Sequence, residues 1–154
     1  MTGSEAHTAL GAISADMVFK LATYLALMGW LVLAAAPLRR DVAVSVARWA
    51  VAILCGAYAA MLVRALGGGG GTAFAQMGTL DGVVALMKSR EALLIGWVHY
   101  LAFDLFTGAW IVGDAPRSNV PHWLVLPCLF LTLMAGPVGL LVYLLIRSIR
   151  QPRR

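Results

Sequence analysis

The chain contains four apolar runs, each about as long as a membrane-spanning helix. They cover residues 17–37, 46–66, 92–113 and 122–147. A hydrocarbon core about 30 Å thick requires about 20 consecutive apolar residues in a helix, because each residue advances the helix by about 1.5 Å. Four such runs take up most of a chain of 154 residues. We therefore expect one all-α domain, a polytopic membrane protein with four transmembrane helices.

The composition argues against a water-soluble domain. Hydrophobic residues make up 61% of the chain and charged residues 12%, whereas an average soluble domain is about half apolar and a quarter charged. The formal net charge of +5 comes mainly from Lys and Arg residues that border the apolar runs. This placement favours lipid headgroups over nucleic acid as the partner of the positive charges.

The positions of the Lys and Arg residues predict the orientation in the membrane. Four crossings would place both termini on one side, together with the loop between the second and third runs. Eight Lys and Arg residues border that side and four border the other. Because cytoplasmic segments carry an excess of Lys and Arg, we expect an inner-membrane protein with both termini in the cytoplasm. The segment before residue 17 carries Glu5 and Asp16 but no Lys or Arg, so we expect a retained first helix rather than a signal peptide.

Two further features refine this scheme. Residues 79–88 have apolar side chains at helical spacing after a plausible cap at Thr79, but ten residues are too few to span a bilayer. We expect a short helix at the membrane interface, followed by Ser89 as the cap of the third run. In the fourth run, Pro127 and the sequence Gly-Pro-Val-Gly at 136–139 should bend the helix.

The third run carries two ionisable residues near its middle, His99 and Asp104. A carboxylic acid at that depth costs about 2.5–3.5 kcal/mol on insertion scales, so it should face the bundle and have a partner. Five residues separate the two side chains by about 140° around the helix and about 7.5 Å along it, so they cannot bond directly. They either join helices through hydrogen bonds or belong to a substrate site.

Other polar and aromatic residues fall at similar depth. Counted from one side of the membrane, Tyr24 and Tyr58 lie level with His99, and the three side chains are expected to form one polar layer. Phe103 lies four residues after His99 in an aromatic stripe that fits either packing or a ligand groove. With Trp97 and Tyr100, the two tyrosines and Phe103 are our candidate ligand contacts.

No motif for a metal, haem or nucleotide is evident. His99 is the only histidine well inside an apolar run, so a second haem ligand is missing, and no Glu-x-x-His pair suggests a di-iron bundle. The glycine tract at 67–71 lacks the Lys of a phosphate-binding loop. Cys55 and Cys128 each stand alone in an apolar run and are interpreted as packing residues. We therefore expect no metal and no cofactor.

Residues 80–145 resemble the abscisic-acid-deficient-four membrane protein family. The resemblance rests on Pro121-His122, on Leu126-Pro127-Cys128, and above all on the string Trp97-Val98-His99-Tyr100-Leu101-Ala102-Phe103-Asp104-Leu105-Phe106. In plants this family is required to convert violaxanthin into neoxanthin. The resemblance implies an isomerisation of a carotenoid epoxide to an allene within the bilayer, without a redox cofactor. His99 would be the base and a protonated Asp104 the acid.

The sequence thus favours a membrane protein that binds, and in one version isomerises, a carotenoid or similar isoprenoid. Two alternatives remain open. One is a non-enzymatic role in membrane assembly. The other is a small transporter or proton pathway, which His99 and Asp104 alone would suggest, and which would require a homo-oligomer because four helices form only a thin conduit.

Overall fold

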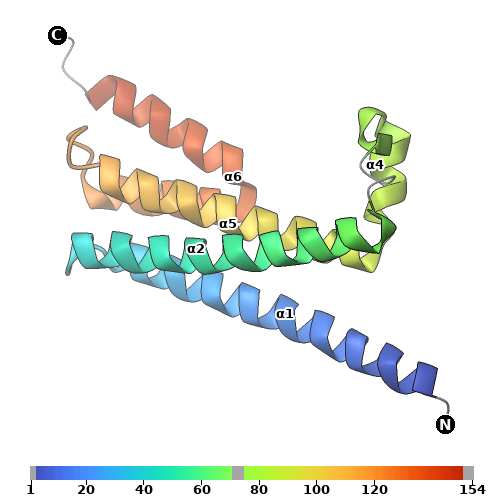
Figure 1. The fold of residues 1–154 in the computed structure, drawn as a ribbon. Helices are drawn as coiled ribbons and strands as arrows, with labels where there is room; N and C mark the ends of the chain where they lie inside the picture. The colour runs from blue at the N-terminus through green and yellow to red at the C-terminus, as the bar shows by residue number, and fades with distance from the viewer. Residues whose placement is uncertain (1–2, 71–74, 151–154) are drawn as a thin grey trace.

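The computed structural model describes residues 3–70 and 75–150, which form helices joined by short connections (Figure 1). No strand occurs among them, so the predicted all-α class is confirmed. Four helices are long and apolar enough to cross a membrane, also as predicted. The elements are α1 (Gly3–Ala34), α2 (Arg40–Ala65), η1 (Leu66–Gly70), η2 (Gln76–Gly78), α4 (Leu80–Met87), α5 (Arg90–Asp114) and α6 (His122–Arg150).

Side-chain caps fix the two helix starts that the sequence predicted. The Thr79 hydroxyl accepts a hydrogen bond of 3.1 Å from the backbone N–H of Gly82 at the start of α4. The Ser89 hydroxyl accepts one of 3.4 Å from the N–H of Ala92 at the start of α5. Such caps satisfy backbone donors that have no partner within the helix. With eight residues, α4 is too short to span a bilayer.

Helix α5 is the centre of the bundle and contacts α1, α2 and α6. Glycines allow close approach between α1 and α5. A Cβ atom at Gly108 would lie 2.6 Å from the ring of Trp30, and one at Gly29 would lie 2.8 Å from the side chain of Leu105. Small residues at helix contacts are the usual means of tight packing in membranes, where apolar burial alone gives no preference for protein over lipid.

Helix α6 is bent back on itself. Its backbone leaves helical geometry at Ala135 (φ −151°, ψ 50°) and Gly136 (φ 4°, ψ −75°). Figure 1 shows the second half, in orange to red, returning toward the end of the bundle where α6 begins. The hydroxyl of Tyr143 accordingly lies 2.7 Å from the carboxylate of Asp114, at the last residue of α5. The predicted bend at 136–139 is confirmed, and it reverses the chain.

The local sequence explains why the reversal occurs there. Pro137 has no N–H to donate to the carbonyl of Leu133, so the helical hydrogen bond is lost at this point. Gly139 lets the two halves touch, because a Cβ atom there would overlap the backbone N of Thr132 and the carbonyl O of Cys128. Pro127 keeps helical geometry on either side and does not break the helix.

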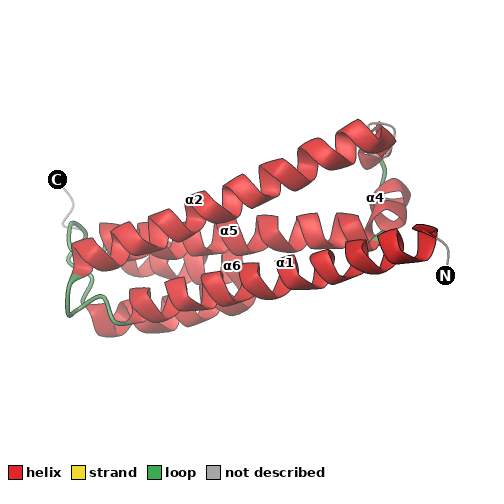
Figure 2. Cartoon of the chain, turned by 60° about the horizontal axis from the view of Figure 1, so that its bottom comes forward, coloured by secondary structure: helices red, strands yellow, loops and turns green. Residues whose placement is uncertain are grey.

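The reversal bears on the predicted membrane topology. The two halves of α6, residues 122–134 and 137–150, are each only about 20 Å long at 1.5 Å per residue, short of a 30 Å core. The start of α1 and the end of α6 consequently lie at opposite ends of the bundle (Figures 1 and 2). Apolar length alone, from which four crossings and both termini on one side are expected, carries no information on whether a helix turns back.

Candidate functional site

Tyr100 and Asp104 of α5 face the break in α6. The Tyr100 hydroxyl donates a hydrogen bond of 3.0 Å to the carbonyl of Leu133, the acceptor that Pro137 leaves without its helical donor. The Asp104 carboxyl group lies against Gly136, where an added Cβ atom would be 2.5 Å from Oδ1. Asp104 Oδ2 is buried and has no hydrogen-bond partner in the described part of the chain. An acid near the middle of a spanning helix thus lies against the backbone of the break in α6.

His99 faces a different side of α5, toward α2. Its ring stacks on that of Phe103, with centroids 4.6 Å apart and an interplanar angle of 29°. The ring of Tyr58 on α2 lies 5.3 Å from the imidazole. His99 and Asp104 therefore belong to two different surroundings, and the structure does not bring them together as an acid and a base around one substrate.

The polar layer predicted from depth is correct for Tyr58 and His99 but wrong for Tyr24. The Tyr24 side chain is 63% exposed and lies on the outer surface of α1, beside Lys20 and Leu21. Depth along a helix is readable from the sequence, but the direction of a side chain depends on how each helix is rotated about its axis. In a bilayer, Tyr24 would face lipid.

The remaining candidate contacts, Trp97 and Phe103, have distinct positions. The indole N–H of Trp97 donates a hydrogen bond of 3.0 Å to the Thr23 hydroxyl and so joins α5 to α1. The Trp97 ring also packs between those of Phe19 and Tyr100. Phe103 is 59% exposed apart from its stacking on His99. Trp97 thus joins two helices, whereas Phe103 covers one face of the imidazole.

A cavity of about 640 Å³ opens between the end of α2, the connection through α4 and the first half of α5. His99 and Tyr58 lie deepest in it along their helices, and Leu86, Met87, Arg64 and Glu91 line it nearer the end of the bundle. Because Arg64 and Glu91 have opposite charges, the outer part of the cavity has no strong net charge of either sign. In the described residues, no group of three or more His, Cys, Asp or Glu side chains is placed to hold a metal ion.

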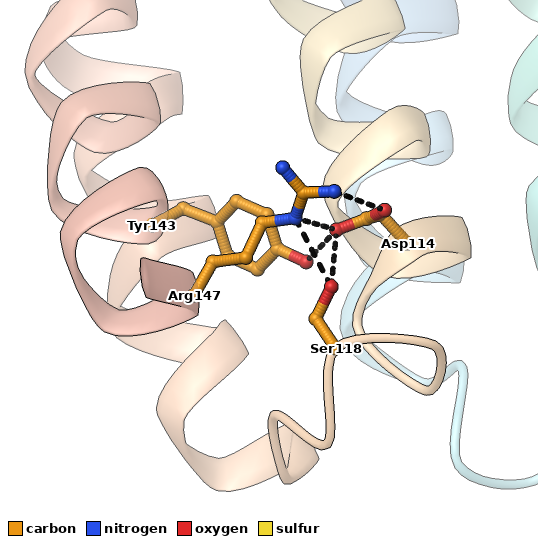
Figure 3. A network of polar contacts seen from close by, with 4 residues as sticks. All are labelled: Asp114, Ser118, Tyr143 and Arg147. Atoms are coloured by element: carbon orange, nitrogen blue, oxygen red, sulfur yellow. Dashed lines mark hydrogen bonds and ion pairs between the residues drawn. The ribbon is translucent and has the colours of Figure 1, made fainter. Parts of the chain in front are cut away.

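A polar network at the other end of the bundle was not predicted from the sequence. Figure 3 shows Tyr143 and Arg147 of α6 meeting Asp114 of α5 and Ser118 of the loop that follows it. Asp114 Oδ2 accepts hydrogen bonds from the Tyr143 hydroxyl (2.7 Å) and the Ser118 hydroxyl (2.8 Å) and forms an ion pair with Arg147 at 2.8 Å from Nε. The N–H at Arg147 Nε donates to the Ser118 hydroxyl (3.1 Å). The guanidinium of Arg147 also lies 5.9 Å from the ring centre of Trp110.

One feature of the sequence points to this network. Tyr143 and Arg147 are four residues apart and share a helix face. Arg147 is the last residue of the fourth apolar run, and Asp114 directly follows the third. Their partnership requires α6 to turn back, which brings positions 114 and 147 together across the loop.

Comparison with known proteins identifies the family. The sequence profile of the ABA DEFICIENT 4-like family matches residues 17–143, which include α2, α4, α5 and most of α6. No curated protein and no solved structure matches the chain. The resemblance seen in the second half of the sequence thus extends to the first two helices. The chain belongs to the ABA DEFICIENT 4-like family.

Proposed function

We propose that this protein binds a carotenoid or a related isoprenoid from the bilayer, with one end of the ligand in the cavity at His99. The observation that carries the proposal is this cavity, which has mainly apolar walls and is lined by the imidazole of His99 and the phenol of Tyr58 at the end nearest the middle of the bundle. Pockets for small molecules are typically of this kind, apolar with a few polar groups that fix orientation. Membership of the ABA DEFICIENT 4-like family supports the same class of ligand.

The size of the cavity indicates how such a ligand would lie. A volume of about 640 Å³ is in the range of pockets that enclose a drug-sized molecule. A carotenoid is longer, with a polyene chain between two end groups. The cavity would therefore take one end group, and the polyene would continue along the apolar helix surfaces in lipid. His99 and Tyr58 would then contact oxygen atoms on the enclosed end.

The same arrangement bears on catalysis. Isomerisation of an epoxide to an allene transfers one proton from carbon to the epoxide oxygen and is redox-neutral, so it needs one base and one acid. In our proposal His99 is the base and the Tyr58 hydroxyl is the donor, because these two groups share the cavity. Asp104 is not assigned the acid role that the family resemblance implied, since it faces α6.

Filling the cavity should abolish pigment binding. Gly96 lines the cavity, and a Cβ atom there would meet only the tip of Met87 at 4.0 Å, so Gly96→Leu fits the fold while occupying the ligand space. We expect the wild-type protein, purified in mild detergent from a carotenoid-producing bacterium, to retain a polyene visible by absorbance. Gly96→Leu should retain at most a tenth as much, and His99→Phe about two- to tenfold less, as expected for one lost hydrogen bond.

Gly56→Leu is the matched control for this experiment. Gly56 lies in α2 with no atom within 4 Å of an added Cβ and does not line the cavity, so this variant should keep its pigment. Full pigment in Gly96→Leu would contradict the location of the site. A colourless wild-type protein from a host rich in carotenoids would contradict the proposal as a whole and favour a non-enzymatic assembly role.

We also propose an orientation in an inner membrane, with the C-terminus in the cytoplasm and the N-terminus outside. The reversal of α6 moves Arg147 and Arg150 to the end of the bundle that holds the α1–α2 connection (Figure 2). In the described chain that end has more cations than the other, and Arg153 and Arg154 follow in sequence. The cations toward it are Arg39, Arg40, Arg48, Arg117, Arg147 and Arg150, against Lys20, Arg64, Lys88 and Arg90. The positive-inside rule then places it in the cytoplasm.

Reporter fusions test this orientation. A reporter active only in the periplasm should be active when fused before Met1 and silent when fused after Arg154, with a cytoplasm-active reporter giving the reverse pattern. If the periplasmic reporter is silent at both termini, both lie in the cytoplasm, as predicted from the sequence alone. This result would contradict the reversal of α6. Activity at the C-terminus alone would keep the reversal but invert the orientation.

A further inference from the structure

The reversal of α6 requires an explanation beyond hydrophobicity. α6 has 29 residues and is the most apolar of the four long helices, so by length and composition it qualifies as a crossing. A bilayer favours a continuous helix, because a break exposes backbone N–H and C=O groups to hydrocarbon. Broken helices persist at membrane depth only where protein groups satisfy or surround the freed backbone. The groups near the break therefore decide whether it can persist.

Two residues of α5 lie at the tip of the hairpin. Tyr100 and Asp104 are one helical turn apart, so both face the same part of α6. Tyr100 donates to the carbonyl of Leu133, just before the break, and Asp104 lies against Gly136, within the break. Pro137 begins the second half of α6, and proline is a favoured residue at the first position of a helix. The first turn of that half has free N–H groups and a partial positive charge, an environment suited to carboxyl oxygen atoms.

Four residues hold the base of the hairpin. Tyr143 is fully buried, and the Asp114 side chain is only 12% exposed. Asp114 has polar partners on the second half of α6 only because this half runs back to the end of α5. If α6 were straight, Arg147 would lie about 37 Å from His122 along the helix axis and out of reach of Asp114.

We infer that two groups of residues hold α6 as a hairpin and so set the number of membrane crossings. They are Tyr100 and Asp104 at the tip, and Asp114, Ser118, Tyr143 and Arg147 at the base. Loss of either group converts α6 into a fourth crossing. Asp104 is then a positioning residue for the membrane topology. This role is independent of the ligand proposed above, because none of these six residues lines the cavity at His99.

The side of the membrane reached by the C-terminus measures the state of α6. A single cysteine placed after Arg154, in a Cys55→Ala and Cys128→Ser background, can be labelled with an impermeant maleimide in intact spheroplasts or in inverted vesicles. A second variant, with its single cysteine before Met1 instead, identifies the N-terminal side. In the otherwise unchanged chain the two cysteines should be labelled from opposite sides.

Variants at the tip should move the C-terminus. Gly139→Leu forces the halves apart, because its side chain overlaps the backbone of Thr132 and Cys128. Asp104→Leu removes the carboxyl group from the break. In each variant we expect at least half of the C-terminal cysteine to be labelled from the N-terminal side, against less than a tenth in the parent. Gly56→Leu, in open space on α2, should behave as the parent.

Exchanging the charges of Asp114 and Arg147 at the base provides a second test, which is needed if the tip variants are not found in the membrane. Asp114→Arg and Arg147→Asp each place like charges together and should shift the C-terminus in the same way. The double variant restores an opposite-charge pair and should return it to the parental side. The inference is overturned if inserted tip variants keep the parental labelling, or if both single base variants match the parent.

Discussion

The fold depends on the cost of leaving backbone polar groups unpaired inside a membrane. At the break in α6 the carbonyl of Leu133 has lost its helical donor to Pro137, and no water is present in hydrocarbon to replace it. The hydroxyl of Tyr100 supplies that donor at 3.0 Å. Because Tyr100 belongs to the central helix, a local repair of the backbone also fixes α6 to the bundle. The second half of α6 can then return to Asp114.

Two faces of α5 make different contacts. One face, at His99 and Phe103, lies beside α2 and the cavity, while another, at Tyr100 and Asp104, supports the broken helix. In our proposals, His99 serves the ligand and Asp104 serves the fold, although only five positions separate them. These two roles together would account for the string of aromatic and polar residues in α5.

The sequence was sufficient for what depends on length, periodicity and local chemistry. The four apolar helices, the caps at Thr79 and Ser89, the bend at 136–139 and the family were all predictable. It was insufficient where three-dimensional direction decides. Tyr24 was predicted from its depth along α1 to join His99, but α1 is rotated so that the Tyr24 side chain points outward. The partnership of Asp114 with Arg147 exists only after a reversal whose angle no residue pattern specifies.

The most direct test of the reversed α6 is a distance measured in a lipid bilayer. Arg117 in the loop before α6 and Ser148 near its end are both exposed, and each is next to a residue of the contact between Ser118 and Arg147. Spin labels at these two positions, examined by pulsed electron paramagnetic resonance in proteoliposomes, should lie within about 20 Å, whereas a straight α6 would separate them by about 40 Å at 1.5 Å per residue. A distribution centred on the short distance is expected from the hairpin. One centred near the long distance would contradict it.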